Sequence, residues 1–254
     1  MSNEFSKKQI NDWLTQLEKG EIKPNHTVSG AMGDFTLLQA ILKSEFPVSI
    51  KHSKLKKFIE LGCDVDQFSA TMTPISMAAV GTSNDEDFKP LIVLMLQYHE
   101  KGHMSDLNIL RSASISLDYE MFPFIIRQNK IDLNATRSKT HILHYLAKDN
   151  STFIINDLFE YAPNTLPNPI NRKGFSPLSI AINELNKNGI VALSRNKNTK
   201  IIGKITAPKM VIEHELIDRY EGNFFEDFPE MTTYAFNTGK EYLLPKTATD
   251  IFLF

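Results

Sequence analysis

Hydrophobic residues near the N-terminus recur at the spacing of one helical face. Ile10, Trp13, Leu14 and Leu17 follow one another at i, i+3, i+4 and i+7, which places them on one side of an α-helix. The preceding residues 6–9, Ser-Lys-Lys-Gln, have the form of a capping box, in which the serine accepts from the backbone and the glutamine reaches back. The pattern predicts an amphipathic helix whose tryptophan belongs to a packed core.

A short apolar motif, called here the helix-opening phrase, recurs along the chain. It begins each time with a threonine, a serine or a histidine. It reads TLLQAIL at 36–42, TPISMAA at 73–79, HILHYLA at 141–147 and SPLSIAI at 176–182. Threonine and serine are good N-caps because the hydroxyl accepts from free amides of the first turn, and proline suits the next position, which needs no amide hydrogen. Each phrase predicts the start of a short helix. The spacing predicts one more start at 108–114.

A second landmark keeps a fixed offset from these phrases. Residues 58–66, FIELGCDVD, and 125–134, IIRQNKIDLN, each lead from an apolar helix through a turn residue, Gly62 or Asn129, into a short loop. The last residue of each segment precedes the next helix-opening phrase by seven residues in both cases. Two independent landmarks with one offset indicate a true repeat.

A recurring unit of roughly 33 residues with these helix starts and loops resembles the ankyrin-repeat family. The resemblance implies an all-α fold, a solenoid of about five helix-turn-helix units. One helix pair cannot bury its apolar face alone, so neighbouring repeats must stack and the ends must be capped. The expected organisation is an N-terminal capping helix in residues 1–24, ankyrin repeats in 25–221, and an irregular C-terminal extension in 222–254.

The last repeat is expected to depart from this plan. Residues 186–206 are largely polar and basic, and a second helix is expected to resume only after Pro208. These residues are therefore expected to be an insertion that forms a mobile loop. The alternative is that the insertion contacts a partner. The extension is acidic and too rich in aromatic residues for a simple disordered tail. It is expected to seal the last repeat; the alternative is a separately active segment that the array delivers.

Composition narrows the classes of function. The net charge of −2 gives no basic excess of the kind that nucleic-acid binders carry. The single cysteine, Cys63, excludes an internal disulfide framework and is expected to be a packed thiol. No apolar run approaches the roughly 20 residues that span a membrane, and no signal-peptide core is present. These features predict a monomeric, cytoplasmic protein with no nucleic-acid partner, no membrane span and no cofactor.

One catalytic motif offers an alternative function. Residues 99–103, His-Glu-Lys-Gly-His, match the H-E-x-x-H signature of zinc hydrolases, in which two histidines on one helical face bind the metal and the glutamate activates water. His99 and His103 would be the metal ligands and Glu100 the base. Downstream residues lack the extended ligand pattern, and the repeat frame ends a helix near Gly102. The preferred expectation is therefore no enzymatic activity, no catalytic residues and no bound metal.

The resemblance to ankyrin repeats implies recognition of another protein through hairpin tips and the exposed faces of the first helices. Interfaces concentrate binding energy in a few aromatic, methionine and arginine residues. The partner-binding residues expected on the tips of this chain are Phe68, Met72, Arg137, Lys139, Arg172, Lys173 and Phe175.

A narrower hypothesis concerns the origin of the protein. The chain resembles secreted ankyrin-repeat effectors of intracellular bacteria in three ways. Its repeats are degenerate, its composition is rich in lysine, asparagine and isoleucine, and it has a C-terminal extension. The resemblance implies export into the host cell cytosol, with a C-terminal export signal that combines glutamates around 213–230 with the apolar end 251–254.

Overall fold

The computed structural model describes residues 4–31, 33–69, 72–81, 87–116, 118–149, 152–184, 186–196 and 198–199, together with the strands 231–235 and 241–245. The chain divides into two compact bodies, Met1–Leu133 and Asn134–Phe254. We refer to them as the N-terminal body and the C-terminal body. The division falls inside the predicted repeat region, before the fourth helix-opening phrase.

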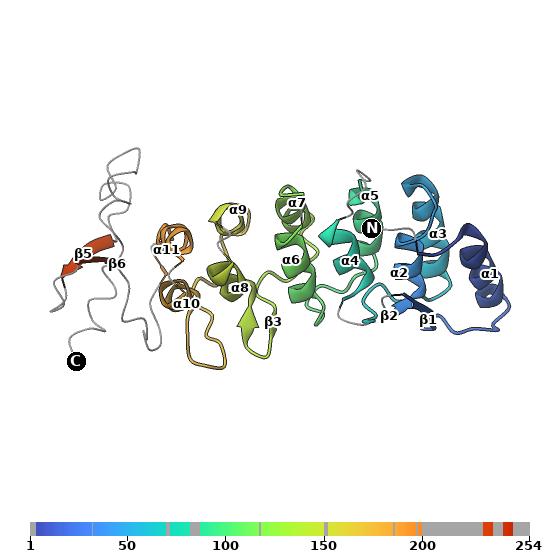
Figure 1. Cartoon of the computed structure of the whole chain (residues 1–254), viewed down its shortest axis with the longest axis horizontal. Helices are drawn as coiled ribbons and strands as arrows, with labels where there is room; N and C mark the ends of the chain where they lie inside the picture. Colours follow the sequence, from blue (N-terminus) through green and yellow to red (C-terminus); the bar gives the residue numbers. More distant parts are fainter. Residues whose placement is uncertain are drawn as a thin grey trace. The chain divides into compact units, whose positions relative to one another are not determined.

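The N-terminal body contains a first helix, a hairpin and three helix pairs. Its elements are α1 (Lys7–Glu18), β1 (Thr27–Gly30), β2 (Gly33–Thr36), α2 (Leu37–Leu42), α3 (Val48–Glu60), α4 (Pro74–Val80), α5 (Lys89–Leu96), α6 (Asp106–Ser114) and α7 (Met121–Arg127). Helix α4 packs between α2 and α6, while α3 packs against α5 (Figure 1). First helices therefore contact first helices and second helices contact second helices, as stacked repeats require.

The C-terminal body repeats this arrangement with two helix pairs. Its elements are β3 (Thr136–Arg137), β4 (Thr140–His141), α8 (Ile142–Lys148), α9 (Thr152–Tyr161), α10 (Pro177–Asn183), α11 (Lys187–Ser194), β5 (Met231–Ala235) and β6 (Glu241–Pro245). Helix α8 packs on α10, and α9 packs on α11. With the three pairs of the N-terminal body, the described residues contain five helix pairs, which confirms the predicted fold class.

The helices begin where their capping residues predict. Ser6 Oγ accepts from Gln9 N at 3.3 Å, and Gln9 Oε1 accepts from Ser6 N at 2.9 Å, so the predicted capping box is present. Thr73 and Ser176 cap α4 and α10 through their hydroxyl groups, and each is followed by a proline at the first helical position. Apolar residues of these helices are buried in the core of each body. Local chemistry therefore sets these helix starts.

Two glycine-type turns and the cysteine also match expectation. Gly62 and Asn129 both adopt positive φ after a second helix, at 95° and 53°, which is the left-handed conformation that ends many helices. Cys63 is buried, and burial raises the pKa of its thiol to about 12. Trp13 is half-buried and meets Phe5 edge to face, with ring centroids 5.5 Å apart.

The third helix start differs from the prediction. Helix α6 begins at Asp106 with Ser105 as its N-cap, so the helix-opening phrase is Ser-Asp-Leu-Asn at 105–108 and Asn108 lies inside the helix. The prediction placed the phrase three residues too late. The helix starts earlier because the loop between α5 and α6 is short. Asp106, at the first helical position, closes this loop by accepting a bond from Gly102 N at 2.8 Å.

The predicted insertion at 186–206 is wrong for residues 187–194, which form helix α11. Asn186 Oδ1 accepts from Gly189 N at 2.9 Å and its Nδ2 donates to Ala147 O at 2.7 Å. A Cβ on Gly189 would lie 2.6 Å from that amide nitrogen, so this start requires glycine. Ile190, Ala192 and Leu193 are buried. The cap and the apolar face outweigh the polar composition of the segment.

The C-terminal extension contains a short antiparallel hairpin, which the expectation of an irregular segment did not include. Strand β5 pairs with β6 from Met231 opposite Pro245 to Ala235 opposite Glu241. The helix expected after Pro208, and the remaining residues of 222–254, lie outside the described residues. The boundaries 1–24, 25–221 and 222–254 therefore stay predictions.

Candidate protein-binding surface

The β3–β4 hairpin presents the first basic tip of the C-terminal body. Thr136 pairs with His141 and Arg137 with Thr140, which leaves a two-residue loop. Both loop residues, Ser138 and Lys139, have positive φ, 55° and 64°. This is the type I′ geometry whose twist matches that of the flanking strands. The side chains of Arg137 and Lys139 are exposed.

The turn before α10 presents the second basic tip. Asn171 Oδ1 accepts from the backbone N–H groups of Lys173 and Phe175, at 2.9 and 3.0 Å. Gly174 takes a φ of 81°, and its N–H donates to Asn171 O at 3.0 Å. These bonds fix the backbone, so Arg172 and Lys173 are exposed on an ordered turn. Phe175 is half-buried behind them.

His144 connects the turn before α10 to helix α8. Its Nδ1 accepts from His141 N at 2.9 Å, and its Nε2 lies 2.9 Å from Pro169 O and 3.2 Å from Phe175 O. Burial lowers the pKa of His144, although these hydrogen bonds partly oppose it. The neutral ring therefore donates from Nε2. His144 therefore has a structural role, because its ring joins helix α8 to the turn before α10.

The predicted tip at 68–72 lies in the N-terminal body and is less exposed. Phe68 and Met72 are half-buried. Ser69 bridges to Met72, and its hydroxyl donates to the carbonyl oxygen of Asp34 on β2. Gln39 Nε2 donates to Met72 O at 2.9 Å. This segment is therefore attached to the preceding hairpin and to α2.

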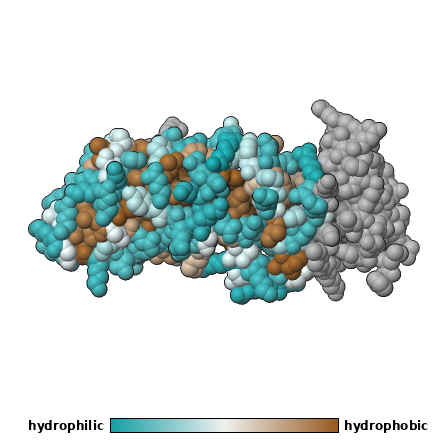
Figure 2. Space-filling view, turned by 180° about the vertical axis from the view of Figure 1, so that it is seen from behind, coloured by the Kyte–Doolittle hydropathy of each residue, from teal (hydrophilic) through white to brown (hydrophobic). Residues whose placement is uncertain are grey.

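The seven predicted partner-binding residues thus fall into two sets. Arg137, Lys139, Arg172, Lys173 and Phe175 belong to two successive repeats of the C-terminal body, which His144 links. Phe68 and Met72 belong to the N-terminal body. Figure 2 shows that the face drawn there is largely hydrophilic, with separate apolar patches between the polar residues.

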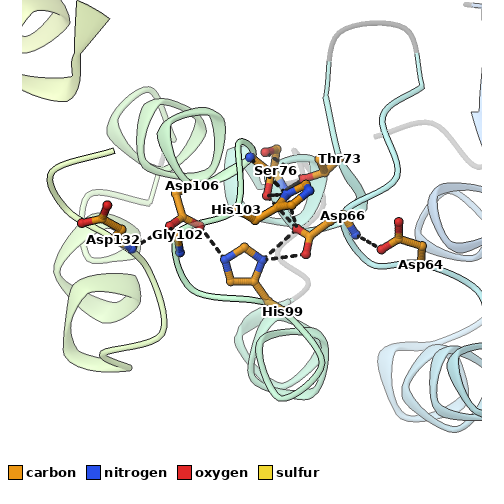
Figure 3. A network of polar contacts seen from close by, with 10 residues as sticks. Asp64, Asp66, Thr73, Ser76, His99, Gly102, His103, Asp106 and Asp132 are labelled. Carbon is orange, nitrogen blue, oxygen red and sulfur yellow. Dashed lines mark hydrogen bonds and ion pairs between the residues drawn. The ribbon is translucent and has the colours of Figure 1, made fainter. Parts of the chain in front are cut away.

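A buried polar network at the loops of the N-terminal body was not predicted (Figure 3). His99 Nδ1 lies 2.7 Å from Asp66 Oδ1, and its Nε2 lies 2.5 Å from Asp106 Oδ1. The side chains of His99 and Asp106 are 0% exposed and that of Asp66 is 7% exposed. The three residues come from the loop after α3, the loop after α5 and the first turn of α6. The network therefore joins three successive repeats.

Further hydrogen-bond donors satisfy the carboxylate oxygens of Asp66 and Asp106. Ser105 Oγ donates to Asp66 Oδ1 at 2.6 Å, so this N-cap serine serves the network instead of its own helix. Asp106 Oδ2 accepts from the backbone N–H of Asp132 at 2.7 Å as well as from Gly102. Buried carboxylates are tolerated when they are paired and hydrogen-bonded in this way.

The charge state of the network follows from its geometry. Burial alone would lower the pKa of His99, but the hydrogen bonds to Asp106 and Asp66 outweigh it and raise the pKa to about 9. For Asp66, burial raises the pKa, whereas the bonds from His99 and Ser105 outweigh that effect and lower it. At neutral pH His99 is therefore an imidazolium that donates from both ring nitrogens.

This arrangement removes the premise of the zinc alternative. Helix α5 ends at Leu96, earlier than the expected end near Gly102, and residues 99–103 are not helical. Both ring nitrogens of His99 face aspartate oxygens, and the ring of His103 stands at 89° to that of His99 with centroids 6.4 Å apart. Among the described residues, no group of three histidine, cysteine or carboxylate side chains is placed to hold a metal ion.

The sequence contained one signal for this network. Asp66 and His99 are 33 residues apart, which is the repeat period itself. An aspartate and a histidine at one position of consecutive repeats indicate contact between the loops.

Comparison with known proteins agrees with the fold. No protein-family model and no curated protein matches the sequence. Among solved structures, the chain is similar to the ankyrin repeat domain of Bcl-3, a unique member of the IkappaB protein family. The sequence identity is 15%, the match covers 72% of this chain and 76% of that one, and the TM-score is 0.50. This likeness concerns the fold: the chain has the ankyrin-repeat fold.

No helix in the described part of the chain combines the length and the apolar character that crossing a bilayer requires.

Proposed function

We propose that this chain is a protein-interaction scaffold that binds a partner protein through hairpin tips. The observation that carries the proposal is the pair of ordered, exposed tips at 136–141 and 171–175. Their backbones are fixed by the type I′ loop and by the Asn171 side chain. Preorganised loops lose little conformational entropy on binding, so their side chains can contribute more of their interaction energy to affinity.

A selection experiment with random peptides tests this function and requires no identified partner. The full chain is immobilised and used to select binders from a displayed peptide library. Each binder is then measured against Lys139→Ala/Arg172→Ala/Lys173→Ala and against Lys8→Ala/Lys19→Ala/Lys23→Ala, three exposed lysines of the N-terminal body. We expect the first variant to lose binding at least about tenfold and the second to retain it, because tip residues contact the ligand.

The opposite result would refute the tips as the binding surface. Binders that lose nothing in the tip variant, while both variants keep the far-ultraviolet circular dichroism of the wild type, would place recognition elsewhere. The expectations of a cytoplasmic, monomeric chain and of a host-directed secreted effector stay predictions. A translocation assay with and without residues 222–254 tests the effector hypothesis, and no export of either form would remove it.

A further inference from the structure

Charge is distributed unevenly along this chain. Residues 134–199 contain eight lysines and arginines and four carboxylates, whereas residues 1–133 contain fourteen and seventeen. The whole chain has a net charge of −2. The two described repeats of the C-terminal body are therefore the positively charged part of an otherwise acidic protein.

The fold separates the charges within these two repeats. Lys139, Arg172 and Lys173 lie on the tips that precede α8 and α10, while Asp149 and Glu184 lie at the opposite ends of the same helices. Glu184 is 3.9 Å from Lys148 at that far end. The other two carboxylates, Asp157 and Glu160, are on the second helix α9. No acidic residue occurs in 134–148 or in 163–183.

Three tip cations are not neutralised within the described chain. Lys139, Arg172 and Lys173 have no described carboxylate within 4.0 Å and no other described ionic or hydrogen-bonded side-chain partner. Their backbone turns are nevertheless ordered by the bonds described above. Arg172 and Lys173 are adjacent on one turn, and like charges this close without a counter-charge repel one another, so a negatively charged ligand would relieve this repulsion.

Two exposed apolar residues precede the second tip in the chain. Leu166 is 56% exposed and Ile170 is 38% exposed, and both lie in the segment that leads into the Asn171 turn. A surface that mixes exposed aliphatic side chains with arginine and lysine suits a protein interface. A nucleic acid would require a larger basic excess and aromatic stacking positions, and the acidic remainder of the chain would repel it.

We infer that the tips of the C-terminal body, Lys139, Arg172 and Lys173 with Leu166 and Ile170, bind an acidic protein segment that carries at least one apolar side chain. The inference rests on the proposed scaffold function and specifies the partner of the same surface. The cations steer and orient the segment, and the aliphatic residues provide contact area.

Defined probes test the charge requirement. A fluorescein-labelled 12-residue peptide of alternating glutamate and serine with two central leucines is titrated into the full chain, in parallel with the same peptide in which glutamine replaces glutamate. We expect the glutamate peptide to bind at least about tenfold more tightly at low salt, and its affinity to fall as salt shortens the screening length. Lys139→Glu/Arg172→Glu/Lys173→Glu should abolish this preference, whereas Lys8→Glu/Lys19→Glu/Lys23→Glu, with the same change in net charge, should keep it.

Each other outcome contradicts the inference. Equal affinity of the two peptides would show that the tips do not distinguish glutamate from glutamine side chains. A preference that both triple variants reduce equally would reflect net charge alone. Tighter, tip-dependent binding of a labelled 20-nucleotide single strand than of the glutamate peptide would assign the surface to nucleic acid. If library binders depend on the tips but show no preference for acid, the scaffold function stands and this inference falls.

Discussion

At the scale of single residues, His99 is the histidine that links the two buried aspartates of the polar network in the N-terminal body. Its ring is fully buried between two aspartates that belong to neighbouring repeats. A buried ion pair does not necessarily add net stability, but removal of one partner leaves the other charge without compensation. The network therefore makes the register of three successive repeats interdependent.

His99→Ala should destabilise the N-terminal body by roughly 3–5 kcal/mol, because Asp66 and Asp106 would remain buried without their shared cation. The measurement is urea unfolding followed by the fluorescence of Trp13, the single tryptophan. His103→Ala is the matched control. Its side chain is 32% exposed, and its Nδ1 lies 3.7 Å from Asp66 Oδ1 and 2.9 Å from Ser105 Oγ, so a loss of about 1 kcal/mol, well below that of His99→Ala, is expected. Equal losses would contradict the central role of His99.

At the scale of elements, the same repeat is built with several local solutions. Thr73 and Ser176 cap their helices through hydroxyl groups, while the Ser105 hydroxyl serves Asp66 and leaves α6 without a side-chain cap. In α11 the cap is an asparagine that also bonds to α8. Repeats with one architecture therefore differ in how their helix ends are satisfied.

Asn186→Ala should destabilise the C-terminal body by about 1–3 kcal/mol, because the change removes both the helix cap and a buried bond to Ala147 O. Asn186→Asp keeps the acceptor for Gly189 N but places a carboxylate oxygen against Ala147 O in a buried site, so it should be at least as destabilising as Asn186→Ala. The exposed Asn188 provides the surface control, for which Asn188→Ala should stay within about 0.5 kcal/mol. Circular dichroism during urea unfolding measures all three. If all three variants kept a free energy of unfolding close to that of the wild type, the interpretation of residues 186–206 as a loop would be restored.

The sequence predicted the capped helices because a cap is a local interaction between residues at most three positions apart. It failed at α11 although the cap from Asn186 to Gly189 is also local, because the surrounding residues are polar and the second bond of the Asn186 amide reaches Ala147, 39 residues away. It also placed the start of α6 three residues late, since Gly102 and Asp132 bond to Asp106 only once the loops are folded together. Among the candidate site residues, the exposed tips followed from the repeat register, whereas the half-burial of Phe68 and Met72 depended on contacts with the preceding hairpin and α2.

At the scale of the whole molecule, the stability of the N-terminal body should depend on pH through the buried network. The folded-state pKa of His99, about 9, lies above its ordinary value of 6.5. Its contribution is therefore fully present below pH 6.5 and is lost as the pH rises through 9. The pKa of Asp66 is lowered, so its contribution is present above its ordinary value of 3.8 and is lost in more acidic solution.

Urea unfolding between pH 5 and pH 9.5 checks this dependence. We expect the free energy of unfolding to fall by up to roughly 3 kcal/mol between pH 6.5 and 9, since each unit of pKa shift corresponds to about 1.4 kcal/mol. His99→Gln should flatten this limb of the profile, because glutamine does not titrate. A wild-type profile that stays level across the same range, or a variant with the same slope, would show that His99 does not carry the effect.

The sequence by itself determined the repeat period, the capped helix starts and the positive-φ turns, because each depends on groups close together in the chain. It also placed the basic residues on the tips of the fourth and fifth repeats. Only the tertiary structure decided that both nitrogens of His99 face carboxylates and that residues 187–194 form a helix. The physical reason is that these features depend on contacts across repeats, between Asp66 and His99 and between Asn186 and Ala147, that exist only when stacked loops and helices exclude water from them.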